Sequence, residues 1–198
     1  MLVIGLTGSI GTGKSAAAGY LEALGASLIS ADQVGHEAYT PNTEAWEQVV
    51  AAFGDEILRE DKEIDRSKLG ALVFSDPSKL ERLNQIMHPR MARMVADKIE
   101  VLRSQGVGVV VVEAALLFEA GWDSLMEEVW VTDSPEQIVI ERLKQRNGLS
   151  EEEARKRISS QMDRAERLER SDCVIDNSGD MAGLESAIKE LWDRRVAV

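Results

Sequence analysis

The sequence has a single cysteine, Cys173, and no run of 18 or more apolar residues. One thiol excludes an internal disulfide framework and is typical of a reducing compartment. Without a long apolar run, no segment predicts a membrane-spanning helix. The N-terminus also lacks the basic region of a secretory signal. We therefore expect a cytoplasmic protein with one domain, because 198 residues suffice for a single substantial core.

Positive charge is scarce as well: 23 lysines and arginines face 35 aspartates and glutamates, which gives a net charge of −12. This balance disfavours broad binding to nucleic acid or to an anionic membrane, and we expect neither as a partner. Nine of the basic residues lie within residues 141–170, against seven acidic ones. A local basic excess in an acidic chain indicates a place where a polyphosphate is met.

The first 15 residues, M-L-V-I-G-L-T-G-S-I-G-T-G-K-S, carry the clearest motif. The apolar start predicts a buried parallel strand, and Gly8–Ser15 fits the P-loop pattern G-x-x-x-x-G-K-S. Its glycines allow the backbone N–H groups to form an anion-binding nest. Lys14 is expected on the β- and γ-phosphates, and the Ser15 hydroxyl on Mg²⁺.

Strands and helices alternate along the rest of the chain. This alternation predicts a three-layer α/β fold with a parallel five-stranded sheet. The expected strands are residues 2–6, 27–32, 107–114, 128–132 and 172–176. Helices are expected at residues 16–24, over most of 43–104 with a break or kink at His88-Pro89, and at 181–195. Two more helices are expected to begin at capping boxes: one at Ser134 and Gln137, and one that runs from Ser150-x-x-Glu153 towards Arg170.

These elements suggest a kinase-like division of one domain into three parts. We expect a core of residues 1–32, 106–145 and 166–198, a helical acceptor lobe of about 33–105, and a lid of about 146–165. In parallel sheets ligands bind beyond the carboxyl ends of the strands, which places the P-loop, Asp32 and Glu113 around one crevice. A basic lid can close over ATP and exclude water.

Single residues at the strand ends are less decisive. Asp32 can deprotonate an attacking hydroxyl, or it can cap a helix that begins near Gln33; local sequence leaves both open. Glu113 ends a valine-rich strand, and we favour a role in holding Mg²⁺ over that of an acid bound by a neighbouring N–H group. His88 has no histidine or cysteine partner at metal-ligand spacing, which favours a structural role.

Three classes of nucleotide-binding protein are compatible with a P-loop. A GTPase switch would carry N-K-x-D, which this sequence lacks. A non-enzymatic nucleotide sensor would bind ATP without acceptor-dependent turnover. A small-molecule kinase needs an acceptor lobe and a lid, and the chain has candidates for both. The kinase interpretation is favoured.

The chain resembles the dephospho-coenzyme A kinase family essentially from end to end. An ordered set of motifs carries the resemblance: G-L-T-G-S-I-G-T-G-K-S at 5–15, I-S-A-D at 29–32, L-x-x-I-x-H-P at 83–89, L-L-F-E at 116–119, S-E-E-E-A-R-K-R-I-S-S-Q at 150–161 and D-C-V-I-D-N-S-G at 172–179. Two departures stand out: family members usually have aspartate in place of Ser30, and D-x-P-L-L-F-E in place of E-A-A-L-L-F-E. Glu113 keeps a carboxylate there but lengthens its reach.

The resemblance implies that the γ-phosphate of ATP is transferred to the 3′-hydroxyl of the dephospho-CoA ribose, with ATP and Mg²⁺ as cofactors and a monomer as the expected state. Asp32 would be the base, Lys14, Arg142 and Arg146 would act on the phosphates, and Ser15 and Glu113 would hold Mg²⁺. The ATP-binding residues would be Gly8, Gly11, Thr12, Gly13, Lys14, Ser15, Ala16 and Asn177, and the acceptor pocket would contain Asp32, His88, Leu117, Phe118 and Glu119. Another nucleoside or nucleotide kinase of this fold is the alternative.

Overall fold

The computed structural model describes residues 1–196, and the chain divides into two compact units. Unit 1 consists of residues 1–29 together with those from 99 onward, and unit 2 consists of residues 30–98. Among the helices of residues 1–196, none is long and apolar enough to cross a membrane.

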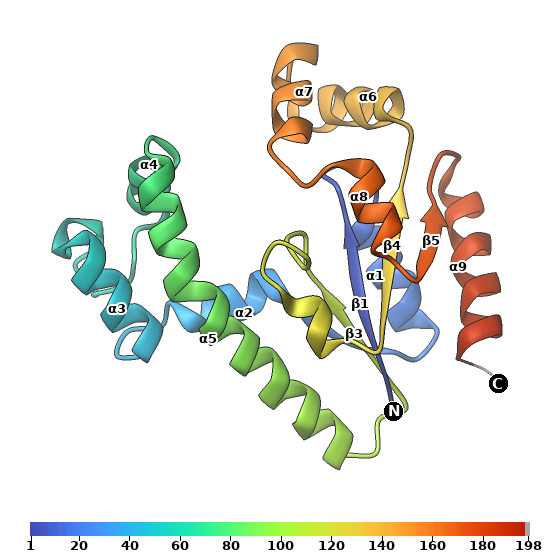
Figure 1. Cartoon of the computed structure of the whole chain (residues 1–198), viewed down its shortest axis with the longest axis horizontal. Helices are drawn as coiled ribbons and strands as arrows, with labels where there is room; N and C mark the ends of the chain where they lie inside the picture. The colour runs from blue at the N-terminus through green and yellow to red at the C-terminus, as the bar shows by residue number, and fades with distance from the viewer. Residues whose placement is uncertain (197–198) are drawn as a thin grey trace. The chain divides into compact units, whose positions relative to one another are not determined.

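Unit 1 is built on a five-stranded sheet with the strand order β2-β3-β1-β4-β5 (Figure 1). The strands are β1 (Leu2–Gly8), β2 (Ser27–Ser30), β3 (Val109–Glu113), β4 (Glu128–Asp133) and β5 (Cys173–Asp176). β1 pairs in parallel with β3 and β4, and β4 pairs in parallel with β5. The register sets Leu6 opposite Glu113 and Gly8 opposite Thr132, so the strand ends that carry the motifs meet at one edge. The predicted fold class is confirmed.

Helices complete unit 1. Its helices are α1 (Lys14–Ala23), α6 (Glu136–Asn147), α7 (Glu151–Ser159), α8 (Arg164–Glu169) and α9 (Met181–Arg195), with a 3₁₀ turn η2 (Trp122–Leu125). α1 and α9 pack together on the sheet, where Leu21 and Ile188 join Ile4, Leu6 and Trp130 in the main core. Burying each such side chain contributes roughly 1.5–3 kcal/mol. A smaller core joins α6 to α7, and Ile10 of the P-loop packs against it.

Unit 2 is helical, as predicted. It contains α2 (Ala31–Ala38), α3 (Glu44–Phe53), the 3₁₀ turn η1 (Asp55–Ile57), α4 (Arg66–Phe74) and most of α5 (Pro77–Ser104). Its core includes Val49, Leu69, Val73 and Ile86. Of the predicted break or kink at His88-Pro89, the break is wrong, because α5 continues through Pro89. The Arg90 guanidinium also donates to the carbonyl of Ile86, one turn earlier in α5, at 3.0 Å.

Two further expectations between β4 and β5 need correction. Ser134 does not cap α6; its hydroxyl instead donates to the Asn177 carbonyl at 2.7 Å, and Pro135 occupies the cap position. The capping box of Ser150 and Glu153 is confirmed, but the helix that it opens ends at Ser159. Asp163 then starts α8 by accepting hydrogen bonds from the first-turn N–H groups. The long predicted helix is therefore two short ones, with residues 160–163 between them.

Candidate functional site

The P-loop connects β1 to α1, and its glycines are required by space as well as by backbone angle. Gly11 and Gly13 have φ of +79° and +94°, a region that other residues rarely adopt. A Cβ on Gly13 would overlap the Asn177 amide, and one on Gly8 would overlap the Thr132 hydroxyl. Thr12 is buried and hydrogen-bonds to Thr132 at 2.8 Å, so its side chain fixes the P-loop against the end of β4.

Three predicted phosphate and metal residues meet at the start of α1. The Lys14 ammonium lies 3.0 Å from Oε1 of Glu113, and the Ser15 hydroxyl donates to the same oxygen at 2.9 Å. Lys14 and Glu113 are largely buried, with side chains 16% and 14% exposed. The reach of Glu113 is thus sufficient to contact both P-loop residues. A carboxylate and a hydroxyl this close are hard oxygen donors of the kind that Mg²⁺ prefers, with waters and phosphates filling its other positions.

Arg142 of α6 binds the loops that surround the P-loop. Its guanidinium donates to the Asn177 carbonyl at 2.9 Å, to the Ser134 hydroxyl at 3.1 Å and to the Gly179 carbonyl at 3.3 Å. Asn177 in turn donates from Nδ2 to the carbonyl of Thr12 at 2.8 Å. All these acceptors are neutral, so the charge of Arg142 is held beside the P-loop without a carboxylate partner among residues 1–196.

Two cavities open on the P-loop. The first, of 400 Å³, lies over the phosphate-binding backbone and is lined by Gly13, Lys14 and Ser15 and by Arg146 and Gln161. The second, of 580 Å³, lies between α6 and the loop after β5. Its lining residues include Gly11, Gly13, Ala16, Arg142, Arg146, Asn177 and Met181. Arg146 lines both cavities. Within the described chain it has no ion pair, and it donates only to Asn147.

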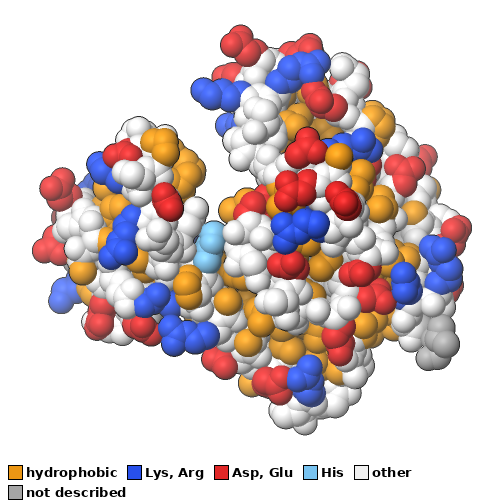
Figure 2. Space-filling view, viewed as in Figure 1, with side chains coloured by type: hydrophobic (Ala, Val, Ile, Leu, Met, Phe, Trp, Pro, Cys, Tyr) orange, Lys and Arg blue, Asp and Glu red, His pale blue; other side chains and the backbone are white. Residues whose placement is uncertain are grey.

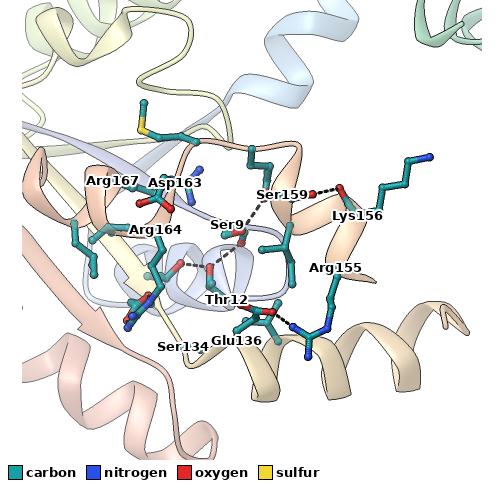
Figure 3. Close-up of a pocket in the computed structure, with 18 residues that line it drawn as sticks. Ser9, Thr12, Ser134, Glu136, Arg155, Lys156, Ser159, Asp163, Arg164 and Arg167 are labelled. Carbon is teal, nitrogen blue, oxygen red and sulfur yellow. Dashed lines mark hydrogen bonds and ion pairs between the residues drawn. The ribbon is translucent and has the colours of Figure 1, made fainter. Parts of the chain in front are cut away.

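A third cavity, of 520 Å³, lies between the P-loop side of β4 and the segment α7–α8 (Figure 3). The hydroxyls of Ser9 and Thr12 face it from the P-loop, and Arg155 reaches across its rim to Glu136. On the opposite wall Arg164 donates from Nε to Asp133 at 2.8 Å, which raises the pKa of Arg164. Arg167 is buried and its Nη2 lies 3.5 Å from Glu119.

Carboxylate partners neutralise part of the basic excess of residues 141–170. Arg155, Arg164, Arg167 and Arg170 each have a carboxylate partner. Acidic and basic side chains are interspersed over α6 and α7 at the top of the space-filling view (Figure 2). The five remaining cations of the segment have no ion pair in residues 1–196: Arg142, Lys144, Arg146, Lys156 and Arg157. Of these, Arg142 and Arg146 line the P-loop cavities.

The L-L-F-E segment after β3, which the resemblance assigns to the acceptor pocket, packs within unit 1. Leu117 is fully buried and lies close to Gly5 of β1, and Phe118 is 5% exposed with Arg170 stacked over its ring at 4.4 Å. Glu119 accepts from the backbone N–H of Met162 at 3.2 Å. These contacts join α8 to the loop that follows Glu113, and they leave the Leu117 side chain no exposed surface for a ligand.

Asp32 and His88 belong to unit 2. α2 begins at Ala31 with Ser30 at the cap position, so the alternative that Asp32 caps a helix near Gln33 is wrong. Asp32 is an exposed residue in the first helical turn, directly after β2. His88 lies inside α5. The residues that the structure describes contain no group of three or more histidine, cysteine or acidic side chains suited to a metal ion.

Sequence reasoning missed several residues of the site. Gln161 accepts from Ser9 Oγ at 2.7 Å and from the Ile10 N–H at 2.8 Å, which ties the α7–α8 connection to the P-loop. Asp133 and Thr132, at the end of β4, hold Arg164 and Thr12. The only sequence signal was position: Gln161 ends the lid motif, and Asp133 follows a strand.

Comparison with known proteins gives a consistent result. A family model described as dephospho-CoA kinase matches residues 2–183. A dephospho-CoA kinase from Geobacter sulfurreducens is 44% identical over 195 residues, which covers 98% of this chain and 99% of that protein. Two solved structures are similar: TT1252 from Thermus thermophilus, with 30% identity and a TM-score of 0.79, and a dephospho-CoA kinase from Campylobacter jejuni, with 28% identity and a TM-score of 0.76. Each covers 98% of this chain and 97% of the other.

Proposed function

The chain belongs to the dephospho-CoA kinase family of ATP-dependent kinases, and from this premise we propose how its residues carry out the reaction. The γ-phosphoryl group of ATP is transferred to the 3′-hydroxyl of the dephospho-CoA ribose. The new bond forms at that oxygen, the bond between the γ-phosphorus and the β–γ bridging oxygen breaks, and ADP leaves. Phosphoryl transfer of this kind depends mainly on positioning and charge stabilisation.

The meeting of Lys14, Ser15 and Glu113 is the observation that supports the proposal most. Lys14 lies 3.0 Å from Glu113 and lines the 400 Å³ cavity in which the β- and γ-phosphates would lie. Ser15 and Glu113 would hold Mg²⁺, which neutralises charge on the phosphates when it is bound. Arg146 would reach the phosphates from α6, since it lines the phosphate cavity and has no ion pair in residues 1–196.

The second P-loop cavity is the proposed place for adenine. It adjoins Gly11 and Ala16, and Asn177 and Met181 line it. Arg142 would then be a positioning residue, because its hydrogen bonds fix the Asn177 loop against the P-loop. The helical unit 2 and the segment 146–165 are proposed as acceptor lobe and lid. A single buried cysteine suits the reducing cytoplasm in which we place the protein.

Asp32 is the proposed base, which takes the proton of the 3′-hydroxyl as the phosphoryl group arrives. We expect Asp32→Asn to lower kcat by roughly 10²–10⁴-fold while MgATP binds as before, since an amide cannot accept the proton. The measurement is ADP release from MgATP with dephospho-CoA, beside AMP and adenosine as acceptors. Asp55→Asn makes the same change at an exposed residue of unit 2 and should leave turnover unaltered.

The other functions give different results in this assay. Preference for AMP or adenosine over dephospho-CoA would identify another nucleotide or nucleoside kinase. Tight binding of ATP with no acceptor-dependent ADP release would identify a sensor. Full activity in Asp32→Asn would remove Asp32 from the mechanism and leave the substrate assignment intact.

A further inference from the structure

Gln161 occupies an unusual position between the P-loop and the α7–α8 segment. It lies in residues 160–163, where the predicted long helix is interrupted. Its side chain is half-buried and lines both the 400 Å³ phosphate cavity and the 520 Å³ cavity of Figure 3. Its neighbour Met162 donates its backbone N–H to Glu119 at 3.2 Å. A second contact, independent of the P-loop, thereby holds the backbone next to Gln161.

The orientation of the Gln161 carboxamide follows from its partners. A backbone N–H can only donate a hydrogen bond, so the atom that faces the Ile10 N–H at 2.8 Å must be the carbonyl oxygen Oε1. Ser9 Oγ donates to the same oxygen at 2.7 Å. The Nε2 amide group must therefore point away from Ser9 and Ile10. Within residues 1–196 neither of its two N–H groups has a hydrogen-bond acceptor.

A donor fixed in this way suits an anionic ligand. Ile10 belongs to the P-loop that forms the anion nest, and Lys14 and Arg146 line the same cavity as Gln161. The carboxamide adds two donors to this cavity without adding charge. Donors that are already oriented stabilise the charge that develops on the oxygens of a transferring group, because no reorganisation is needed during the reaction.

We propose that Gln161 is a further catalytic residue of the phosphoryl transfer, which donates from Nε2 to an oxygen of the γ-phosphoryl group while Oε1 stays bound to Ser9 and Ile10. This inference rests on the function proposed above. It gives the α7–α8 segment a direct chemical role in addition to covering the site. The competing explanation is that Gln161 only anchors this segment to the P-loop.

Gln161→Glu separates the two explanations, because a carboxylate can still accept from Ser9 and Ile10 but presents a negative acceptor where Nε2 donated. We expect kcat with saturating dephospho-CoA to fall by about 10²–10³-fold, the usual loss when one such donor is removed. The melting temperature should stay at the wild-type value. Gln105→Glu makes the same change at an exposed residue of unit 1 that has no side-chain hydrogen bond in the described chain, and should match the wild type in both measurements.

A second variant and a pH series keep the test decisive. Gln161→Met removes anchor and donor together, and should lower both kcat and the melting temperature. For Gln161→Glu, the ratio of its kcat to that of the wild type should rise as pH falls, because a protonated carboxyl group regains an O–H donor. Taking the ratio cancels every effect of pH that the two proteins share.

The outcomes are distinct from those that test the function. Wild-type kcat in Gln161→Glu would overturn the donor role. A loss of kcat that follows the loss of thermal stability in both variants, with a flat pH ratio, would show an anchor only. If the wild-type protein itself releases no ADP in response to dephospho-CoA, the proposed function fails, whatever the variants do.

Discussion

Gly13 is the residue at which backbone angle and space constrain the P-loop together. Its φ of +94° and the overlap of any Cβ with the Asn177 amide both disfavour a side chain. We expect Gly13→Ala to weaken MgATP binding by more than about tenfold, since the left-handed backbone alone costs roughly 1–2 kcal/mol. Equilibrium binding of a fluorescent ATP analogue measures this. Gly106→Ala is the control: its φ is +77° but a Cβ there has open space, so it should lower stability and leave nucleotide binding unchanged.

Glu113 is the second residue whose geometry makes a prediction. Its Oε1 contacts both Lys14 and Ser15. Glu113→Gln removes the negative charge that would attract Mg²⁺, so the Mg²⁺ concentration for half-maximal ADP release should rise by roughly 10–100-fold. Titration of Mg²⁺ at fixed ATP measures the change, with exposed Glu185→Gln in α9 as the matched control. An unchanged Mg²⁺ requirement would show that Glu113 does not hold Mg²⁺ and serves only to position Lys14.

At the scale of single residues, the sequence predicted the members of the P-loop motif. It did not predict contacts between side chains that lie far apart in the chain. Gly8–Ser15 could be assigned because the motif fixes both spacing and conformation. Arg142 was expected on the phosphates, and in this structure its guanidinium donates to neutral acceptors in the two loops after β4 and β5. Those acceptors come together only after β4 and β5 have paired, so no local sequence pattern predicts them.

At the scale of elements, the capping box of α7 connects helix stability to pH. The pKa of the Glu153 carboxyl is lowered, first because the Ser150 backbone N–H donates to it and then by the Ser150 hydroxyl. A carboxyl group with a lower pKa in the folded state stabilises that state above its unfolded pKa, and loses the contribution as pH falls through the folded pKa. We therefore expect the start of α7 to loosen in acid, below the ordinary glutamate pKa of 4.5.

Amide hydrogen exchange across α7, corrected for intrinsic rates, tests this. Protection should fall between pH 7 and pH 3 in the wild type. In Glu153→Gln the protection should hardly depend on pH, because the amide does not titrate. Glu152→Gln alters the adjacent residue, which has no side-chain partner in residues 1–196, and should behave like the wild type. Equal pH dependence in all three proteins would exclude the capping box as the cause.

Elements were predictable where a local signal and packing agree. The five strands follow from their apolar runs, and α9 follows from its amphipathic pattern. Pro89 misled the prediction because α5 buries side chains on both sides of it in the chain, and packing of Ile86, Met87, Val95 and Ile99 outweighs the local cost of proline. The interruption at residues 160–163 was missed because it depends on the distant contacts of Gln161 and Met162.

At the scale of the whole molecule, the two units should respond to different ligands. MgATP should increase exchange protection in unit 1, at residues 8–16 and 158–163, where the P-loop contacts the α7–α8 segment. If unit 2 is the acceptor lobe, dephospho-CoA should protect residues 33–98 instead. Hydrogen exchange with Asp32→Asn avoids turnover during labelling. Protection of unit 2 by MgATP alone, with no further change on adding dephospho-CoA, would contradict this division of labour.

The strand order has a consequence for how the chain is made. β1 is synthesised first but lies in the centre of the sheet, and its partner β3 follows about 100 residues later. At roughly 5–20 residues per second on the ribosome, β1 waits about 5–20 s before a neighbouring strand emerges. All of unit 2 leaves the ribosome during that interval. The helical unit can thus be complete while the apolar N-terminal strand is still unpaired, which makes β1 the segment of the nascent chain that most needs protection by a chaperone.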